Sequence, residues 1–319
     1  MAQPDGAKAQ KGRARADFDA ARHDLEDQVR ATNDRINART GRPLFIAIGV
    51  GLGLGALLLL SLLIVTWLFV VFAAALIVVA AFEFATALRA AGRDVPRTPV
   101  VLTALAVVPA SFFAIDPSIG LTKEAGHLIA SVLGVVLIAL WRLVEAAFPS
   151  RRASASAVIR DIGAGAFIVL YVIFLPSFFV LLTAHEGGQW WTLAALIVVV
   201  SVDTGAYATG VSFGKHPMVP SISPKKTWEG FAGSVLVATL AAVLLAIFML
   251  QQPWWVGVIL SLSLVVTATV GDLTESLIKR DLGTKDMSTW LPGHGGLLDR
   301  LDSALPSAAV AYALFIVFS

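Results

Sequence analysis

Apolar runs of membrane-spanning length recur along most of the chain, separated by short polar connections. We predict helices over nine stretches, at about residues 44–63, 67–88, 99–115, 127–143, 162–183, 190–209, 231–250, 254–271 and 304–318. A helix needs about 20 apolar residues to cross the hydrocarbon core of a bilayer, so these stretches are typical of membrane spans. Since lipid offers the backbone no hydrogen-bond partner, the expected fold class is all-α, a polytopic helical membrane protein.

Two local features refine these helices. The first two belong to one apolar run from Leu44 to Leu88, which is too long for one span, and we place the turn between them at Ser61 to Trp67. Pro176 lies inside the fifth helix and is expected to kink it, because proline lacks the N–H that continues a helix.

The sequence divides into a polar tail and two membrane regions. Residues 1–43 lack the features of a secretory signal and should stay attached as a cytoplasmic tail. Within it, Asp17 to Arg39 is either one weakly amphipathic helix or part of a disordered charged segment, and both interpretations stay open. We assign residues 44–183 to amino-terminal transmembrane helices and 184–319 to a carboxyl-terminal catalytic transmembrane region.

Composition supports a membrane protein and excludes several chemistries. Apolar residues make up 57% of the 319 residues, and the absence of cysteine excludes disulfides, thiolate metal sites and cysteine nucleophiles. A net charge of +2 is too small to indicate a nucleic-acid partner. All but one of the 24 Lys and Arg residues fall on one side of the predicted membrane, Lys123 being the exception. The positive-inside rule therefore predicts a cytoplasmic amino terminus, an outer carboxyl terminus and cytoplasmic polar connections in the second half.

The densest chemistry lies between the last two predicted spans, from Ser276 to Asp302. These 27 residues hold four acids, four bases, one of five histidines and a Gly-Gly pair. Just upstream, Asp272, Glu275, Ser276 and Lys279 are spaced so that they share one stripe of a helix. A solvated, salt-bridged loop is the alternative, which this density of charge beside Asp272 disfavours.

The loop and the start of the last helix add candidate ligands for an anion and a metal. The candidates are Lys285, Asp286, His294, Gly295, Gly296, Asp299, Arg300 and Asp302. Glycines allow backbone amides to approach an anion, and a helix amino terminus favours phosphate oxygens. Carboxylates from two helices with nearby bases suit Mg²⁺ held together with nucleotide phosphates. For His294 we favour a phosphate contact over an acid–base role.

Two upstream segments extend the candidate site. Asp203 and Tyr207 share a face of the sixth span, where a carboxylate normally faces a polar cavity, although a purely structural hydrogen-bond role is the alternative. The following connection carries Ser223, Lys225, Lys226 and Thr227, which either form a polyphosphate cradle or are ordinary residues of a cytoplasmic loop. Glu83, in the second span, is either a paired interfacial acid or a residue with a role near the active site.

These residues resemble the signature of the phosphatidate cytidylyltransferases, also called CDP-diacylglycerol synthases. The matching positions are Ser276, Lys279, Arg280, Lys285, Asp286, His294, Gly295, Gly296, Asp299, Arg300 and Asp302, together with the Gly271-Asp272 pair and the SPKKTWEG run. The resemblance covers roughly Val200 to Ser319 firmly and the earlier spans by hydropathy alone.

The resemblance implies transfer of a cytidylyl group from CTP to phosphatidate in the cell (inner) membrane, with the active site facing the cytoplasm. It implies Mg²⁺ held by Asp272 and Asp299, a monovalent cation such as K⁺ beside it, and a homodimer. We expect catalytic roles for Asp272, Asp299, Lys279, Lys285 and Arg300. Substrate binding is expected of Ser223, Lys225, Lys226, Thr227, Asp203, Tyr207, Glu275, Ser276, Arg280, Asp286, His294, Gly295, Gly296 and Asp302.

Other readings make different predictions. The spaced motif of the CDP-alcohol phosphotransferases is not found in this sequence. A CTP-dependent lipid-alcohol kinase would move the γ-phosphate and release CDP, whereas cytidylyl transfer releases pyrophosphate. An ion-coupled secondary transporter would use Asp203 and Asp272 to bind its ion, but the charged residues gather at one membrane face and no paired interrupted helices repeat between the halves.

Overall fold

A computed structural model describes residues 44–113, 121–149, 153–284, 287–288 and 296–319. The segment from Asp17 to Arg39, for which an amphipathic helix and a disordered tail both stay open, lies outside this described part. Residues up to Gly55 belong, with 292–294, to one compact unit, of which only 44–55 are described. The other unit, Ala56–Leu291 with Gly295–Ser319, carries all the described residues of the candidate site.

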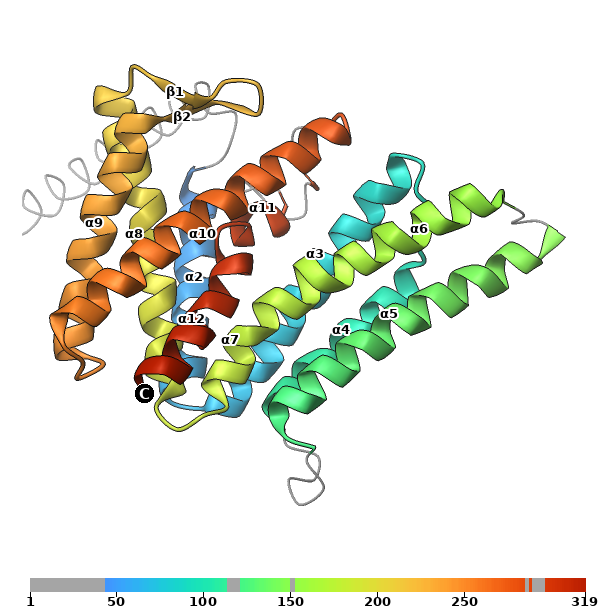
Figure 1. Cartoon of the computed structure of the whole chain (residues 1–319), viewed down its shortest axis with the longest axis horizontal. Coiled ribbons are helices and arrows are strands. Elements are labelled where there is room, and N and C mark those ends of the chain that lie inside the picture. Colours follow the sequence, from blue (N-terminus) through green and yellow to red (C-terminus); the bar gives the residue numbers. More distant parts are fainter. Residues whose placement is uncertain (1–43, 114–120, 150–152, 285–286, 289–295) are drawn as a thin grey trace, which may run out of the picture. The chain divides into compact units, whose positions relative to one another are not determined.

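The described chain is almost entirely helical. Its helices are α2 (Leu44–Leu63), α3 (Thr66–Ala90), α4 (Arg97–Phe112), α5 (Lys123–Ala147), α6 (Ala155–Ile168), α7 (Leu175–Thr183), α8 (Gly188–Phe213), α9 (Trp228–Phe248), α10 (Trp254–Asp281), α11 (Leu298–Leu301) and α12 (Ala304–Phe318). Each of the nine predicted stretches lies within or overlaps these helices, and the predicted turn at Ser61 to Trp67 is confirmed between α2 and α3. Within the second unit, α3, α4, α5 and α6 pack side by side (Figure 1).

Seven helical segments of the described residues are long and apolar enough to cross a membrane. They are Thr66–Ala90, Lys123–Ala147, Ala155–Thr183, Gly188–Phe213, Trp228–Phe248, Trp254–Asp281 and Leu298–Phe318. α4 is a shorter apolar helix, as is the part of α2 from Gly51 to Leu63. The protein is therefore an α-helical, polytopic membrane protein.

The fifth predicted helix is irregular where proline was expected to disturb it. Between α6 and α7 lies a π-helical segment, η3 (Val169–Phe174), and Pro176 stands in the first turn of α7. Proline cannot donate a backbone hydrogen bond to the preceding turn, and π-helical turns are a recognised cause of helix distortion. Tyr171 lies within η3, and its hydroxyl donates to the backbone carbonyl of Gly271 on α10 at 3.1 Å.

The polar connection after α8 forms a small β-hairpin, which the all-α prediction did not include. Strand β1 (Pro217–Val219) pairs antiparallel with β2 (Ser223–Thr227), so that Pro217 faces Thr227 and Val219 faces Ser223. The Glu229 carboxylate, in the first turn of α9, accepts hydrogen bonds from the backbone N–H groups of Lys215 and His216 at 3.1 and 3.2 Å. These contacts fasten the start of the hairpin to α9.

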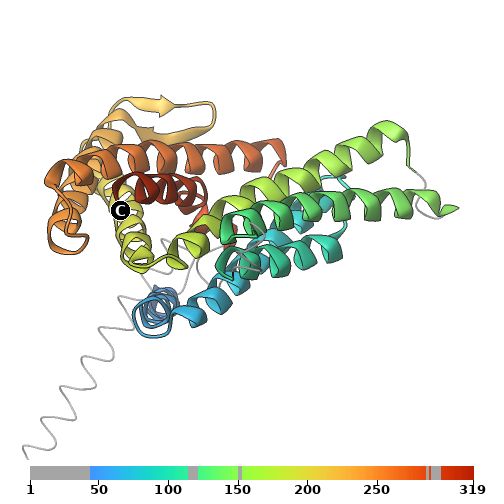
Figure 2. The same ribbon diagram turned by 60° about the horizontal axis from the view of Figure 1, so that its bottom comes forward.

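Small residues allow close helix packing around the candidate site. A Cβ atom at Gly205 of α8 would lie 2.9 Å from the carbonyl oxygen of Gly233 on α9, and one at Gly230 would lie 3.0 Å from that of Ala206. Membrane helices have little hydrophobic drive to associate with each other, so such close backbone contact provides much of the packing. α10 in turn lies alongside α12, in agreement between the two ribbon views (Figure 2).

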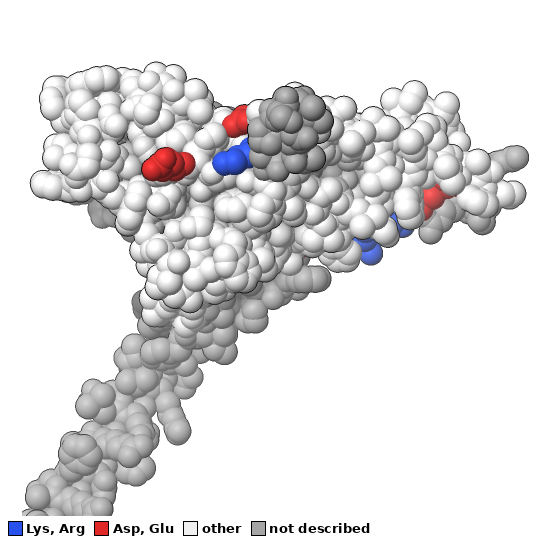
Figure 3. All heavy atoms as spheres, turned by 90° about the horizontal axis from the view of Figure 1, so that it is seen from below, with Lys and Arg blue, Asp and Glu red and all other residues white. Residues whose placement is uncertain are grey.

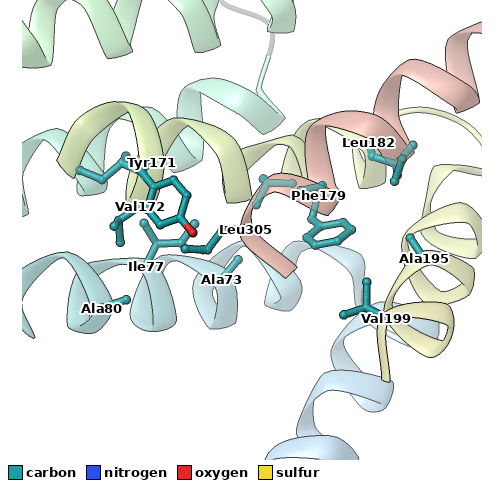
Figure 4. Close-up of a cluster of buried hydrophobic side chains, with 14 of the residues drawn as sticks. Ala73, Ile77, Ala80, Tyr171, Val172, Phe179, Leu182, Ala195, Val199 and Leu305 are labelled. Carbon is teal, nitrogen blue, oxygen red and sulfur yellow. The ribbon is translucent and has the colours of Figure 1, made fainter. Parts of the chain in front are cut away.

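The buried core of the second unit joins α3, η3, α7, α8 and α12. Ala73, Ile77 and Ala80 of α3 face Val172 of η3, and Leu305 of α12 lies beside them (Figure 4). Because α12 also packs on α7, helices from both sides of the predicted division at residue 184 share this core. That division stays a prediction.

Large apolar side chains also cover much of the outer surface. On α9, Leu236, Leu240 and Phe248 are 72%, 64% and 74% exposed. On one face of the molecule almost all described side chains are uncharged (Figure 3). Exposed apolar area of this extent is costly in water and suits contact with lipid chains.

Candidate active site

A cavity of about 410 Å³ opens between α8, the hairpin, α9, α10, α11 and the residues that join α11 to α12. Its polar lining consists of Asp203, Tyr207, Ser223, Lys225, Lys226, Thr227, Ser234, Thr269, Asp272, Asp299, Arg300, Asp302 and Ser303. Segments nearly 100 residues apart in the sequence thus meet around one space. Ten of the residues predicted from sequence line it: four aspartates, three bases, Tyr207, Ser223 and Thr227.

α8 contributes Asp203 and Tyr207 on one face, as their helical spacing predicted. The Ser303 hydroxyl donates to Asp203 Oδ1 at 3.3 Å, which links α8 to the start of α12. Tyr207 is 75% exposed and makes the rim of the cavity. Both residues therefore line the cavity rather than a closed core.

The hairpin brings a lysine onto the carboxylate of α10. Lys226 Nζ lies 2.7 Å from Asp272 Oδ2, and the Ser276 hydroxyl donates to Asp272 Oδ1 at 3.3 Å. Thr227 ends β2 and caps α9, its hydroxyl accepting the Gly230 N–H at 3.1 Å. The cap fixes where the strand ends and the helix begins, and thereby holds Lys226 beside Asp272.

The stripe predicted on α10 divides between two environments. Asp272 lines the cavity, whereas Glu275 is buried, with its side chain 1% exposed, and forms an ion pair with Lys279. Glu275 Oε2 lies 2.5 Å from Lys279 Nζ, which also donates to Asp299 Oδ1 at 3.1 Å. Lys279 therefore bridges two carboxylates from α10 and α11. The structure places Glu275 behind this lysine and outside the cavity lining.

Asp299 organises the backbone around it. Its Oδ2 accepts the N–H of Gly296 at 2.9 Å and that of Met287 at 3.1 Å, and its side chain is 7% exposed. A Cβ atom at residue 296 would lie 2.9 Å from Asp299 Oδ2 and 3.1 Å from the backbone nitrogen of Ser288, so glycine favours this close approach. One carboxylate thereby holds two separate points of the connection between α10 and α11.

Glu83 holds the same connection between α10 and α11 through a second set of hydrogen bonds. It is 2% exposed, and its Oε1 accepts the Ser288 hydroxyl at 2.6 Å and the Leu297 N–H at 3.1 Å. Its Oε2 accepts the Leu298 N–H at 3.1 Å. Sequence reasoning left the role of Glu83 open. The structure makes it a buried anchor of the segment that carries Asp299, and a single acid within an apolar span was the signal for it.

A second cavity, of about 340 Å³, lies on the other side of Lys225. Ser223, Lys225, Ser276, Lys279, Arg280 and Thr284 contribute its polar lining. The Arg280 guanidinium donates to the carbonyl oxygen of Ile222 in the hairpin, which ties α10 to the hairpin tip. The predicted residues Lys285, Asp286, His294 and Gly295 lie outside the part of the chain that the structure describes.

The lining of the first cavity fits a hard divalent cation. Among the described residues, no three His, Asp or Glu side chains are arranged to hold a metal ion by themselves. Mg²⁺, however, is usually held by one or two carboxylates, with phosphates and water supplying the other ligands. Four aspartates and three bases line the cavity. The ligand atoms that the aspartates offer to a metal are all oxygens. A divalent cation would relieve the repulsion between these carboxylates.

Close packing beside the carboxylates gives a prediction on stability. A Cβ atom at Gly271 would overlap the backbone carbonyl oxygen of Asp302 and lie 2.9 Å from the Pro306 ring. We expect Gly271→Ala to destabilise the purified protein by about 1–3 kcal/mol, because α10 and α12 must separate. Thermal unfolding in one detergent measures it. Gly163→Ala is the control, because a Cβ there meets nothing within 4 Å; equal melting temperatures would contradict this packing.

The apolar helices and the cavity define an integral membrane protein with a polar cavity lined by both bases and carboxylates. Comparison with known proteins identifies the family. The profile of the cytidylyltransferase family matches residues 45–318, so the chain belongs to that family and is a nucleotidyltransferase.

Two named relatives cover most of the chain, and a third covers about half of it. A protein of Mycobacterium leprae (strain TN) named phosphatidate cytidylyltransferase is 42% identical over 284 residues, which is 86% of this chain and 88% of the relative. A protein of the same name from Mycobacterium bovis (strain ATCC BAA-935 / AF2122/97) is 40% identical over 86% of this chain and 89% of its own length. Another from Bacillus subtilis (strain 168) is 39% identical over 48% of this chain and 59% of the relative.

Proposed function

We propose that the chain transfers the cytidylyl group of CTP to phosphatidate and releases pyrophosphate, which makes CDP-diacylglycerol for phospholipid synthesis. One observation carries the proposal: in a membrane protein of the cytidylyltransferase family, Lys226, Asp272, Asp299 and Arg300 line one polar cavity. The relatives named above bear the name of this activity.

The reaction asks little of a general base. A phosphate oxygen of phosphatidate forms a bond to the α-phosphorus of CTP, and the bond from that phosphorus to the bridging oxygen of the β-phosphate breaks. Phosphomonoesters have a second pKa of about 6, so the attacking phosphate is largely a dianion at neutral pH. The main barrier is repulsion between two polyanions, and catalysis is then chiefly positioning and neutralisation of charge.

The bases around the cavity supply the positive charge that would reduce this repulsion. Lys225, Lys226 and Arg300 line it, and Lys279 stands directly behind Asp299. Lys226 is held by Asp272 and Lys279 by two carboxylates, so these ammonium groups are fixed before substrates enter. Preorganised charge costs little reorganisation during the reaction. We assign Lys225, Lys226 and Arg300 to substrate phosphates, with Ser223 and Thr227 as further hydroxyl contacts.

Asp272 and Asp299 would hold Mg²⁺ in this proposal. When bound with the nucleotide, the ion would neutralise phosphate charge and polarise the α-phosphorus. Asp299 Oδ2 accepts two backbone N–H groups, and among the described residues its Oδ1 accepts from Lys279. Asp203 and Asp302 would add negative charge beside it. A monovalent cation such as K⁺ next to the Mg²⁺ is a further part of the proposal.

The setting of the site completes the proposal. We place the enzyme in the cell (inner) membrane as a homodimer with nine spans, the amino terminus in the cytoplasm and the carboxyl terminus outside. The bias of Lys and Arg to one side supports this orientation, because such residues are retained in the cytoplasm. The cavity then opens where CTP is available, while the acyl chains of phosphatidate stay in the bilayer.

Purified protein with phosphatidate and labelled CTP tests the reaction. We expect label from the α-phosphate in the lipid product, label from the γ-phosphate in pyrophosphate, and loss of both products when EDTA removes the divalent cation. Transfer of the γ-label to the lipid, with release of CDP, would instead identify a lipid kinase. Ion-coupled uptake into liposomes without any CTP turnover would identify a transporter.

A further inference from the structure

A third cavity, of about 500 Å³, lies on a different face of α10 from the first cavity, which we call the catalytic cavity because the proposed reaction takes place there. The lining of this third cavity comes from α6, from the last turns of α3 and α10, and from residues just beyond those two helices: Phe84, Leu88, Arg93, Arg160, Ala164, Phe167, Leu277, Ile278, Asp281 and Leu282. We call it the lateral groove. No residue is shared between its lining and those of the other two cavities described above.

The lateral groove is amphipathic. Arg160, Ala164 and Phe167 follow one another at helical spacing along one face of α6, so a basic residue continues into an apolar floor. Phe84 and Leu88 of α3 are spaced in the same way. An apolar trough with cations at one end matches an acyl chain joined to a negatively charged head group.

The two arginines of the groove are not neutralised by an ion pair with another described residue. Nearby, Arg89 pairs with Asp94 at 3.0 Å and Arg142 pairs with Asp161 at 2.9 Å. Within the described ranges, by contrast, neither Arg93 nor Arg160 forms an ion pair. Asp281 also lines the groove, so its formal charge is +1, from two arginines and one aspartate. The groove therefore favours an anion.

The groove also lies at the same end of α10 as the catalytic residues. Lys279 and Arg280 line the second cavity, while Ile278 and Asp281, their neighbours in the sequence, line the groove. By the bias of Lys and Arg, this end faces the cytoplasmic leaflet, where anionic phospholipids meet basic residues. A soluble phosphate compound would make no use of the apolar floor.

We propose that the lateral groove binds an anionic glycerophospholipid, with its phosphate on Arg93 and Arg160 and one acyl chain along Phe167 and Leu277. The site is separate from the catalytic cavity and does not rest on the reaction assigned to it. We infer this class of ligand because two arginines without an ion-pair partner among the described residues lie beside an apolar trough at the membrane interface.

Native mass spectrometry of the purified full-length protein tests the groove. Dioleoyl phosphatidylglycerol and dioleoyl phosphatidylcholine are offered as probes, since they share acyl chains and differ in charge. We expect about tenfold preferential retention of the anionic lipid, a loss of about fivefold in Arg93→Gln or in Arg160→Gln, and no preference in the double variant. Lys215→Gln, an exposed base on the hairpin connection, should keep the full preference.

Two further arms separate the possible failures. Leu277→Trp fills the trough without changing its charge and should also reduce lipid retention, and gel filtration shows whether each variant stays monodisperse. Inorganic phosphate at millimolar concentration should not displace the lipid. Equal retention of the anionic lipid by the double variant and the unmodified protein would overturn the proposal, because the lipid would then lie elsewhere, as in the catalytic cavity. Displacement by phosphate alone would overturn it as well.

Discussion

Replacing Asp272 with asparagine is expected to lower the rate of cytidylyl transfer at least about a hundredfold. Asparagine keeps the shape of the side chain but removes a negative charge and half of its acceptor oxygens. Lys226, 2.7 Å away, loses its charged partner, and the proposed Mg²⁺ loses a ligand from α10. Because both losses act on charge in the reacting complex, kcat should fall more than KM for CTP changes. Initial rates over a range of CTP concentrations measure this split.

Asp299→Asn should lower the rate by at least as much. In addition to weakening a proposed metal ligand, it removes the negative charge that faces Lys279 and replaces one of the two oxygens that accept from Lys279 and from the Gly296 and Met287 N–H groups. Glu186→Gln is the control for both variants, because Glu186 is exposed and makes no hydrogen bond or ion pair among the described residues. Near-normal Mg²⁺-dependent turnover by either aspartate variant would contradict its assignment.

Glu83→Gln is expected to reduce kcat by about 30-fold or more, although Glu83 does not line the cavity in which the substrates are proposed to bind. Its carboxylate accepts three hydrogen bonds, from the Ser288 hydroxyl and the Leu297 and Leu298 N–H groups. Glutamine turns one of these oxygens into a donor that faces another donor. Hydrogen bonds to charged groups contribute about 1.5–3 kcal/mol each, and 1.4 kcal/mol is a factor of ten. The segment that carries Asp299 should then spend less time in the conformation that Glu83 holds.

The design of this experiment separates positioning from general unfolding. Ser288→Ala removes only one of the three donors and should have a smaller effect than Glu83→Gln. A positioning role lowers kcat and leaves KM for CTP within a few-fold, in protein that remains monodisperse and melts cooperatively. Unchanged kcat in a well-folded Glu83→Gln protein would show that the anchor is not needed for catalysis.

Hydropathy predicted the helices well because the bilayer fixes both their length and their composition. The run from Leu44 to Leu88 was divided correctly into α2 and α3. The position of Pro176 located the irregular part of the fifth helix, since the missing N–H of proline has a defined local effect. Helix ends were less predictable: α10 continues to Asp281, well past the last apolar residue of the predicted span.

The β-hairpin could not be predicted from its own residues. Ser223 to Thr227 has no alternation of apolar and polar side chains, which is the usual signal of a strand. Its position depends on contacts with α9, including the hydrogen bond of 2.5 Å between His216 Nδ1 and Glu229 Oε1. Sequence spacing nevertheless placed Lys226 among the candidate residues, because adjacent lysines framed by hydroxyls suit a phosphate site.

The residues of the candidate site could be predicted better than the contacts between their side chains. The spacing of Asp272, Glu275 and Lys279 placed them on one side of a helix, but spacing alone could not show that Glu275 is buried behind Lys279. The partners of Glu83 lie more than 200 residues further along the chain. Contacts of that range depend on how the helices assemble, which no local pattern in the sequence records.

Transfer of label from the α-phosphate of CTP to phosphatidate, by the unmodified protein and by Asp272→Asn side by side, tests the central claim most directly. The claim is that the cavity between α8, the hairpin, α10 and α11 performs Mg²⁺-dependent cytidylyl transfer. We predict labelled CDP-diacylglycerol from the unmodified protein and from Glu186→Gln, and about 1% of that rate or less from Asp272→Asn. Equal labelling of the lipid by Asp272→Asn would contradict the claim.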